Sequence, residues 1–256
     1  MNVSQLKEHF EKLISPTLSC EWDNDGLMLC SDSSKEIKKA LITLDLNESA
    51  VEKALECGVD CIFTHHPFIF KPLKSICDTN SRARMIFRLA EKSISVFSYH
   101  TRLDALQGGV NDVLVSLLSI NNAIPLGEGE LSMARIGSIT PCALSEFSLF
   151  VKEKLHCPSL CVAKSDNGKD EIKRVAVLGG ASDKDFINAA IEADADVFLT
   201  GDASYNSVID ANIDGMHVIC AGHYFTENPV LEFFKKELGS LKIEGIVYNC
   251  GYFEYL

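Results

Sequence analysis

The sequence alternates short apolar runs with segments of helical periodicity, and this pattern limits the possible folds most strongly. Strands are expected at 38–44, 60–64, 94–99, 173–178, 196–200, 217–221 and 245–248. Helices are expected at 2–14, 48–57, 79–92, 108–119, 144–155, 183–193, 203–212 and 226–238. Because such alternation is typical of parallel strands joined by helices, we predict an α/β fold with mainly parallel sheets.

The length of 256 residues is sufficient for two lobes. The segment 120–130, INNAIPLGEGE, is rich in Asn, Gly and Pro and is therefore typical of a boundary or of a chain crossing between lobes. We predict two α/β lobes: a metal-binding lobe formed by 1–125 together with 222–256, and a second lobe formed by 126–221.

The chain is acidic, with 36 Asp and Glu residues against 24 Lys and Arg residues, a formal net charge of -12. This charge disfavours nucleic acids and anionic membranes as partners and favours a cation or a small molecule. No apolar run is long enough to span a membrane, and the N-terminal MNVSQLKEHFEKLI has the pattern of an amphipathic helix. We expect a cytoplasmic protein that does not contact membranes.

The ten cysteines are scattered and form no CxxC pair. We expect most of them to be reduced and buried as small apolar residues. The spacings 57/61 and 157/161 would allow metal binding, but both lie in or beside apolar runs, which favours a place in the core.

Histidines follow three of the expected strands. DCIFT leads into His65 and His66, ISVFSY into His100, and HVICAG into His223. Because ligands of open α/β sheets bind beyond the carboxyl ends of strands, we expect these imidazoles to converge. Adjacent strand residues point to opposite faces, so His65 and His66 share a site only if the strand ends there, and Pro67 favours such an end.

Two carboxylates accompany the histidines. Glu227 follows His223 by four residues where a helix is expected to begin, which places both on one face, and Thr226 is a candidate cap for that helix. Asp104 follows His100 by four residues. Five or six nitrogen and oxygen donors suit two divalent ions that share a carboxylate, for which Glu227 is the candidate. The absence of thiolates leaves Zn²⁺, Mn²⁺, Fe²⁺, Co²⁺ and Ni²⁺ open.

A histidine at the end of a strand is more often structural than metal-binding, and His9, His156 and His217 are assigned to that class. The combination of HHP, HxxxD and HxxxE at strand ends is harder to explain structurally and favours a metal site.

Five motifs give the chain a specific resemblance to a known family. They are EWDNDGLML (21–29), FTHHPFIF (63–70), YHTRLD (99–104) with GGVND (108–112), and FLTGDASYN (198–206) followed by AGHYFTE (221–227). In their order and spacing they resemble the Nif-three-like proteins, a dinuclear metal-centre family whose bacterial members are called GTP cyclohydrolase 1 type 2 homologues. The resemblance covers nearly the whole chain and corresponds to the short form without an inserted domain.

The resemblance implies metal ligands at His65, His66, Asp104, His223 and Glu227, which the strand-end argument reaches independently. It also implies a Nif-three-like fold and a toroidal homohexamer with the metal sites facing an internal cavity. One position departs from the family: Asn206 stands where the family often has a histidine, which affects a contact to substrate or to a metal ligand. A glycine-rich turn at 179–182 either offers backbone amides to a phosphate or simply joins a strand to a helix.

Two functions remain open. The first is a metal-dependent hydrolase that uses activated water, with His100 as proton shuttle or substrate-binding group and with Asp23 and Asn24 lining the entrance or forming a turn. The resemblance suggests opening of the GTP ring, and hydrolysis of a nucleotide or phosphoester would use the same ions. The alternative is a metal-binding, metal-chaperone or scaffold protein without catalysis.

Overall fold

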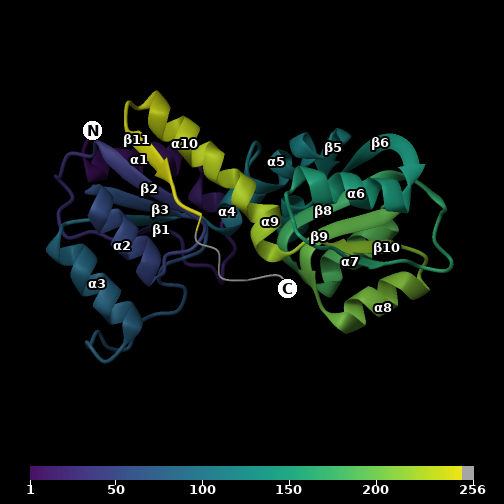
Figure 1. Cartoon of the computed structure of the whole chain (residues 1–256), viewed down its shortest axis with the longest axis horizontal. Helices are drawn as coiled ribbons and strands as arrows, with labels where there is room; N and C mark the ends of the chain where they lie inside the picture. The colour runs from purple at the N-terminus through teal and green to yellow at the C-terminus, as the bar shows by residue number, and fades with distance from the viewer. Residues whose placement is uncertain (250–256) are drawn as a thin grey trace. The chain divides into compact units, whose positions relative to one another are not determined.

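The computed structural model describes residues 1–249, which form two units. Unit 1 contains Met1–Leu103 and the segment that begins at Leu231, whereas unit 2 contains Asp104–Val230. In Figure 1 unit 1 is purple and blue with a yellow C-terminal part, and unit 2 runs from teal through green to yellow-green at its end. The chain therefore leaves the first unit, builds the second, and returns.

Unit 1 is built on a five-stranded sheet in the order β1-β4-β3-β2-β11. Its strands are β1 (Gly26–Leu29), β2 (Lys39–Thr43), β3 (Cys61–Thr64), β4 (Ser95–Ser98) and β11 (Glu244–Val247). Its helices are α1 (Val3–Leu13), η1 (Pro16–Leu18), α2 (Glu48–Cys57), α3 (Ser81–Glu91) and α10 (Leu231–Ser240). All neighbouring strands are parallel except β1 and β4, so this sheet is mainly parallel, as predicted.

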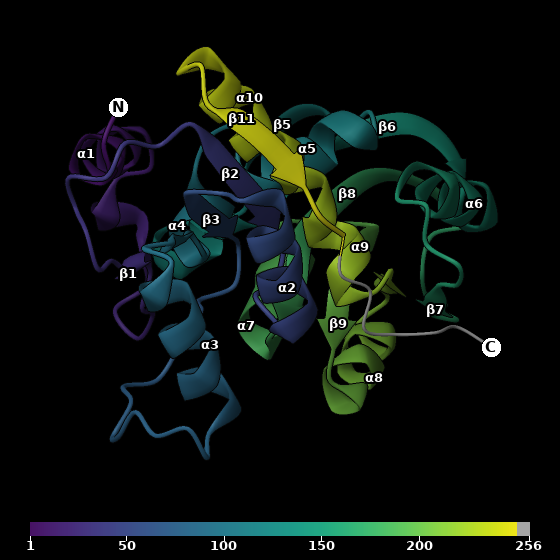
Figure 2. The same cartoon turned by 60° about the vertical axis from the view of Figure 1, so that its left-hand side comes forward.

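Both faces of the unit 1 sheet are buried. Leu41, Ile62 and Val96 pack against α2 and α3, which lie next to each other in Figure 2. On the opposite face, Phe63 and Phe97 stack on each other with ring centroids 4.9 Å apart. Phe10 of α1 and Phe234 of α10 join them. The sequence shows near-continuous apolar strands because parallel strands covered on both faces contact no water.

Unit 2 is built on a six-stranded sheet in the order β5-β6-β8-β9-β10-β7. Its strands are β5 (Asn121–Pro125), β6 (Arg135–Ala143), β7 (Cys161–Ala163), β8 (Glu171–Ser182), β9 (Val197–Ala203) and β10 (His217–Cys220). Its helices are α5 (Val110–Leu117), η2 (Gly129–Met133), α6 (Leu144–Lys154), α7 (Lys184–Glu192), α8 (Tyr205–Ile213), α9 (His223–Glu227) and η3 (Asn228–Val230). A short helix, α4 (Thr101–Ala105), contains the residues at which unit 1 ends and unit 2 begins.

The unit 2 sheet is mixed. Its central strands β8, β9 and β10 are parallel, as predicted, but β5, β6 and β7 add to them antiparallel. These flanking strands and β1 were not expected from the sequence, because each is short, exposed along much of its length or interrupted by irregular register. The α/β class is confirmed, and antiparallel edges complete both sheets.

In each unit an aspartate carboxylate that bonds to two backbone amides aligns neighbouring strands. Asp60 precedes β3 and its carboxylate accepts hydrogen bonds from the backbone amides of Lys38 and Lys39, at 2.9 and 3.1 Å. Asp196 precedes β9 and accepts from the amides of Lys173 and Arg174, both at 2.8 Å. A carboxylate bonded to two adjacent amides fixes the register of neighbouring parallel strands where their ladder begins.

The division into units differs from the predicted lobes. Residues 104–125 and 222–230, expected in the metal-binding lobe, belong to unit 2. The reason is packing: α5 inserts Leu114 into the core formed by β8, β9 and α6, and α9 packs against β8 and β9. The segment 120–130 is not a linker, because it forms β5 and the start of η2. No helix in residues 1–249 is both long and apolar enough to cross a membrane.

Candidate functional site

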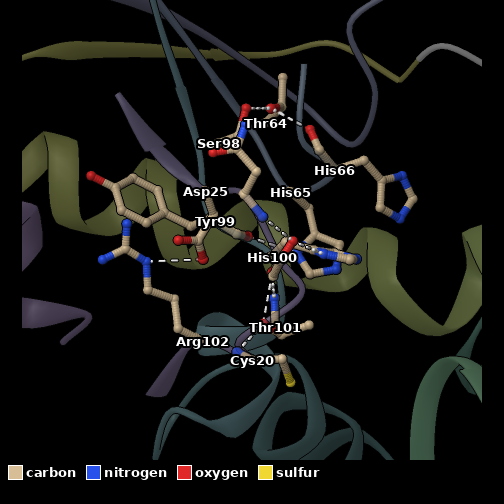
Figure 3. Close-up of polar contacts among 12 residues, drawn as sticks. Cys20, Asp25, Thr64, His65, His66, Ser98, Tyr99, His100, Thr101 and Arg102 are labelled. Atoms are coloured by element: carbon tan, nitrogen blue, oxygen red, sulfur yellow. Dashed lines mark hydrogen bonds and ion pairs between the residues drawn. The ribbon is translucent and has the colours of Figure 1, made fainter. Parts of the chain in front are cut away.

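In unit 1 the residues after β3 form a tight turn that carries His65 and His66. The hydroxyl of Thr64, the last residue of β3, donates to the carbonyl of His66 at 2.8 Å and lies 2.7 Å from the Ser98 hydroxyl (Figure 3). Ser98 in turn accepts from the amide of Phe68 at 3.2 Å. The strand therefore ends immediately before His65, and Pro67 favours this end.

Each of the two imidazoles is held through its Nδ1 atom. His65 is fully buried and its Nδ1 donates to the carbonyl of Tyr99 at 2.9 Å. The Nδ1 of His66 lies 2.7 Å from Asp45, the carboxylate that follows β2. Both partners are hydrogen-bond acceptors, so in the neutral ring the lone pair is on Nε2. This is the usual arrangement of a metal-binding histidine.

His100 follows β4 and completes a group of three imidazoles. One nitrogen from each of His65, His66 and His100 lies within 4.8 Å of the other two, which is compatible with a metal ion. The Nδ1 of His100 lies 3.0 Å from Asp23, whose other oxygen accepts from the backbone amide and the hydroxyl of Thr101. Asp23 therefore positions His100.

The environment of Asp23 keeps it ionised. Burial alone would raise its pKa, but the hydrogen bond and charge of His100, together with the bonds from Thr101, outweigh burial and hold the pKa of Asp23 far below its ordinary value. The side chain of Asp23 is completely buried, whereas that of His100 is 20% exposed. The exposed partner of this pair is thus the imidazole.

Asn24 and Asp25, the other polar residues of the WDND segment, attach this segment to the rest of unit 1. Asn24 donates to the carbonyl of Ile69, which ties the segment to the turn after β3. Asp25 forms an ion pair of 3.0 Å with the buried Arg102 (Figure 3). Arg102 also forms an ion pair with Glu11. Of the two residues expected at the entrance, Asp23 is interior and Asn24 has a structural hydrogen bond.

Two exposed aromatic rings border His100. Trp22 is 54% exposed and Phe70 is 43% exposed. Their ring centroids lie 6.2 and 6.3 Å from that of His100, both in edge-to-face orientation. Large apolar side chains in such exposed positions are available to contact a planar ligand.

In unit 2 two of the candidate donors are on α9, a single helical turn that begins at His223 and ends at Glu227. The Nδ1 of His223 lies 2.9 Å from Asp202 at the end of β9, and its Nε2 lies 3.2 Å from Glu227. The predicted placement of His223 and Glu227 on one helical face is confirmed. The helix expected at 226–238 is divided into α9, η3 and α10. Thr226 is therefore not a cap but lies within α9, where it donates to the carbonyl of His223 at 2.9 Å.

Glycines allow α9 to approach the strand ends. A Cβ atom at Gly180, whose φ is +70°, would lie 2.1 Å from Glu227 Oε1. A Cβ atom at Gly201 would lie 2.8 Å from His223 Cα. The amide of Gly180 donates to Thr226 at 3.0 Å, so this backbone group is used within the fold. The expected glycine-rich turn at 179–182 is not observed, because these residues continue strand β8, in which Gly180 leaves room for α9.

Asp104 is 8% exposed and lies in α4. The buried Asn111 connects its backbone to β8, because the Asn111 amide donates to the Asp104 carbonyl at 3.3 Å and its oxygen accepts from Gly179 at 2.8 Å. This contact explains the asparagine of the GGVND motif. Asn206, by contrast, is exposed in the first turn of α8.

Asp45 and Asp202 are functional neighbours that the motifs did not indicate, although both follow expected strands. Each carboxylate contacts the Nδ1 of a candidate ligand, which orients the imidazole and raises its basicity. The same strand-end signal that indicated the histidines could have found these two residues. Among the structural assignments, His217 is as predicted: it is buried, with one ring nitrogen on the Ser165 amide and the other on the Lys169 carbonyl.

The donor set fits divalent cations. Imidazole and carboxylate groups without thiolates are present in both units, and four imidazoles have an acceptor at Nδ1. His223 has acceptors at both ring nitrogens, since Asp202 and Glu227 lie on either side of it. The Nε2 atom of His223 and the carboxylate of Glu227 are close enough to coordinate the same cation.

The fold and these donors define a two-unit α/β protein with histidine and carboxylate groups that could bind metal. A family model for Duf34/NIF3 (NGG1p interacting factor 3) matches residues 1–250. The chain belongs to the DUF34/NIF3 family.

Similar proteins support this membership. The GTP cyclohydrolase 1 type 2 homolog of Methanocaldococcus jannaschii is 35% identical over 94% of this chain and 96% of its own length. The Protein NIF3 homolog of Schizosaccharomyces pombe is 30% identical over 96% of this chain and 92% of its own. Among solved structures, reduced HcgD from M. jannaschii has a TM-score of 0.85 at 34% identity, covering 96% of this chain and 97% of that one. The Staphylococcus aureus hypothetical protein SA1388 has a TM-score of 0.87 at 24% identity, covering 100% and 99%, which shows the shared fold.

Proposed function

We propose that this protein binds two divalent cations per chain and uses them to hydrolyse a nucleotide-related small molecule. The proposed metal ligands are His65, His66, Asp104, His223 and Glu227. The observation that carries the proposal is the pair of acceptors around His223, Asp202 at 2.9 Å and Glu227 at 3.2 Å. A cation beside Nε2 would be coordinated by both the imidazole of His223 and the buried carboxylate of Glu227.

A bound divalent ion would supply Lewis acidity and lower the pKa of water to near neutrality. The contribution of the chain is to orient the ligands and to move protons. Asp45 and Asp202 hold the rings of His66 and His223. His100, partly exposed and held by the ionised Asp23, is the proposed group that transfers a proton to or from substrate.

The substrate class is proposed from two sources. Relatives of this chain carry the name GTP cyclohydrolase 1 type 2 homolog. Trp22 and Phe70, exposed beside His100, supply rings on which a nucleobase could stack. Ring opening of GTP and hydrolysis of a phosphoester are both compatible with the same ions, and the native metal is to be identified by experiment.

Replacement of His100 by Asn tests the catalytic part of this proposal. We expect the variant to retain its metal content and to lose about 10²–10⁴-fold in turnover on a panel of nucleotides and phosphoesters. His156→Asn is the matched control, because His156 is exposed and has a φ of +52°, which asparagine tolerates. Glu227→Gln is expected to lower the metal content itself.

The alternative is a protein that binds, delivers or buffers metal without catalysis. If wild-type protein reconstituted with Zn²⁺, Mn²⁺, Fe²⁺, Co²⁺ and Ni²⁺ in turn hydrolyses nothing on the panel, this alternative replaces the hydrolase. If His100→Asn loses metal together with activity, His100 is a ligand and not a proton-transfer group.

Two further parts of the proposal concern the assembled protein. A homohexamer is proposed by resemblance, and light scattering of the purified protein would give a mass of about six chains.

The cytoplasm is the proposed location, because the nine cysteines among the described residues are free thiols, as is typical of reducing compartments.

A further inference from the structure

Two cysteines occupy directly opposite positions in the unit 2 sheet. The three-residue strand β7 pairs antiparallel with β10, and Cys161 is the register partner of Cys220. Opposite residues of an antiparallel pair project to the same face, with Cα atoms about 4.5–5.5 Å apart. Disulfides need Cα separations of about 4.4–6.8 Å, so the ladder places these two residues within bonding range.

We propose that Cys161 and Cys220 are the site of a reversible intramolecular disulfide, formed by exchange with a low-molecular-weight disulfide such as oxidised glutathione. Both cysteines are free thiols in the structure. No other cysteines among residues 1–249 are register partners in a strand pair. The proposal does not depend on the proposed function.

The different exposure of the two thiols determines the order of the steps. Cys161 is exposed on an edge strand, whereas Cys220 is partly buried. Burial is the main cause that raises the pKa of Cys220 to about 11, and the nearby Cys161 and Asp202 add to it. This thiol is therefore protonated at neutral pH. Cys161 is therefore the residue that meets the oxidant first.

The chemistry is two consecutive exchanges. The Cys161 thiolate attacks glutathione disulfide, which forms a Cys161–glutathione bond and releases one glutathione thiolate. Cys220 then loses its proton and attacks Cys161 Sγ, which forms the Cys161–Cys220 bond and releases the second glutathione. The two cysteine thiols are oxidised, one glutathione disulfide is reduced, and the two cysteine protons pass to the two glutathione molecules.

The disulfide would fix the end of the sheet from which α9 begins. Cys220 is the last residue of β10, and only Ala221 and Gly222 separate it from His223. In the reduced protein β7 is an exposed three-residue edge strand. Oxidation would join this strand covalently to β10 and reduce its local opening.

The test uses the full chain with a chelator present, equilibrated in glutathione buffers of increasing oxidation and then digested without reduction. Mass spectrometry is expected to detect a peptide pair linked through Cys161 and Cys220, with loss of two hydrogen atoms. Amide exchange in residues 161–163 is expected to slow at least several-fold in the oxidised protein. Reduction with dithiothreitol restores both signals to their starting values.

Three variants make the result specific. Cys161→Ser and Cys220→Ser are each expected to abolish the linked peptide, and in Cys220→Ser the mixed disulfide of Cys161 with glutathione accumulates. Cys77→Ser, which removes another exposed cysteine, is the control and keeps the linked pair. The proposal is overturned if wild-type Cys161 stops at the glutathione adduct, if both thiols stay reduced, or if the linked peptides contain other cysteines.

Discussion

Four candidate histidines, three in unit 1 and one in unit 2, share one feature at the level of single residues: an acceptor at Nδ1. The acceptors are the Tyr99 carbonyl for His65, Asp45 for His66, Asp23 for His100 and Asp202 for His223. These contacts set the tautomer and hold each ring in one orientation before any ligand arrives. A site assembled in this way loses little side-chain entropy when it binds a cation.

Gly180→Ala is expected to lower the free energy of unfolding by more than the cost of placing alanine in this backbone conformation. Alanine at a positive φ costs about 1–2 kcal/mol, and the new Cβ atom, 2.1 Å from Glu227 Oε1, would force α9 to move. This steric overlap is expected to lower the free energy of unfolding by a further amount of about 1–3 kcal/mol, the cost of overpacking. Urea denaturation in the presence of a chelator measures the loss, and metal titration measures the expected drop in affinity.

Gly58→Ala is the matched control for this prediction. Gly58 has a φ of +59°, and a Cβ atom there would contact nothing within 4 Å. The free energy of unfolding of Gly58→Ala should fall only by the cost of the backbone conformation, about 1–2 kcal/mol. The metal affinity of this variant should be unchanged. Equal losses in the two variants would show that crowding at Glu227 is unimportant.

At the level of elements, the same aspartate device aligns parallel strands in both units. Asp60 and Asp196 each precede a central strand and accept from two adjacent amides of its neighbour. In unit 2 the second oxygen of Asp196 lies 2.6 Å from Lys169 Nζ. Burial would raise the pKa of Asp196, but the bonds from Lys169, Lys173 and Arg174 outweigh burial and lower it.

Asp196→Asn is expected to destabilise the protein by about 1–3 kcal/mol at pH 7, since a carboxylate with three donors becomes a neutral amide. A lowered folded-state pKa means that the stability due to Asp196 is complete above the unfolded-state pKa of about 4 and is lost as pH falls through the folded-state value. The difference between wild type and variant should therefore shrink below about pH 4 in urea denaturation.

Asp194→Asn is the control for the pH experiment. The Asp194 side chain is 85% exposed and contacts the same Lys169 at 3.3 Å. Removal of an exposed ion pair should cost less than about 1 kcal/mol. A difference for Asp196→Asn that stays constant from pH 7 to pH 3 would contradict the assignment of an ionised, stabilising carboxylate.

At the level of the whole molecule, the candidate donors are divided between the two units. His65, His66 and His100 belong to unit 1, and Asp104, His223 and Glu227 belong to unit 2. Each group is fixed by its own sheet, because every one of these histidines follows a parallel strand. The stability of the protein is therefore expected to respond to metal through residues in both units.

Addition of a binding divalent cation is expected to raise the thermal unfolding midpoint, and a chelator is expected to reverse the rise. At a free metal concentration of about 100 times Kd the stabilisation is about 2.7 kcal/mol per site, or roughly 5–10 °C for a chain of this size. Differential scanning calorimetry measures the shift. His65→Ala and His223→Ala should each reduce it, whereas His156→Ala should not.

An undiminished shift in both ligand variants would place the metal elsewhere on the chain. An unchanged midpoint with every candidate metal would contradict metal binding altogether. Both outcomes can be separated from a folding defect, because the circular dichroism of each metal-free variant can be compared with that of the wild type.

By itself the sequence determined the α/β class, most of the central strands and the candidate ligands. Parallel strands buried on both faces leave unbroken apolar runs, and the residue after such a run marks a strand end. The sequence also predicts the ends of a helix where capping residues are present. Helix α2 begins after Asn47, whose side chain accepts from the Ala50 amide, and ends at Cys57, before Gly58 in the left-handed conformation.

Only the tertiary structure decided which segments pack together. It assigned α5 and α9 to unit 2, added the antiparallel edges, and revealed Asp45, Asp202 and Gly180 as neighbours of the candidate ligands. It also placed Cys161 opposite Cys220. The strand-end pattern could indicate Asp45 and Asp202 as site residues, but which residue each one contacts depends on pairings between segments far apart in the chain. A local pattern of apolar and polar residues does not specify such partners, because many pairings bury the same surface.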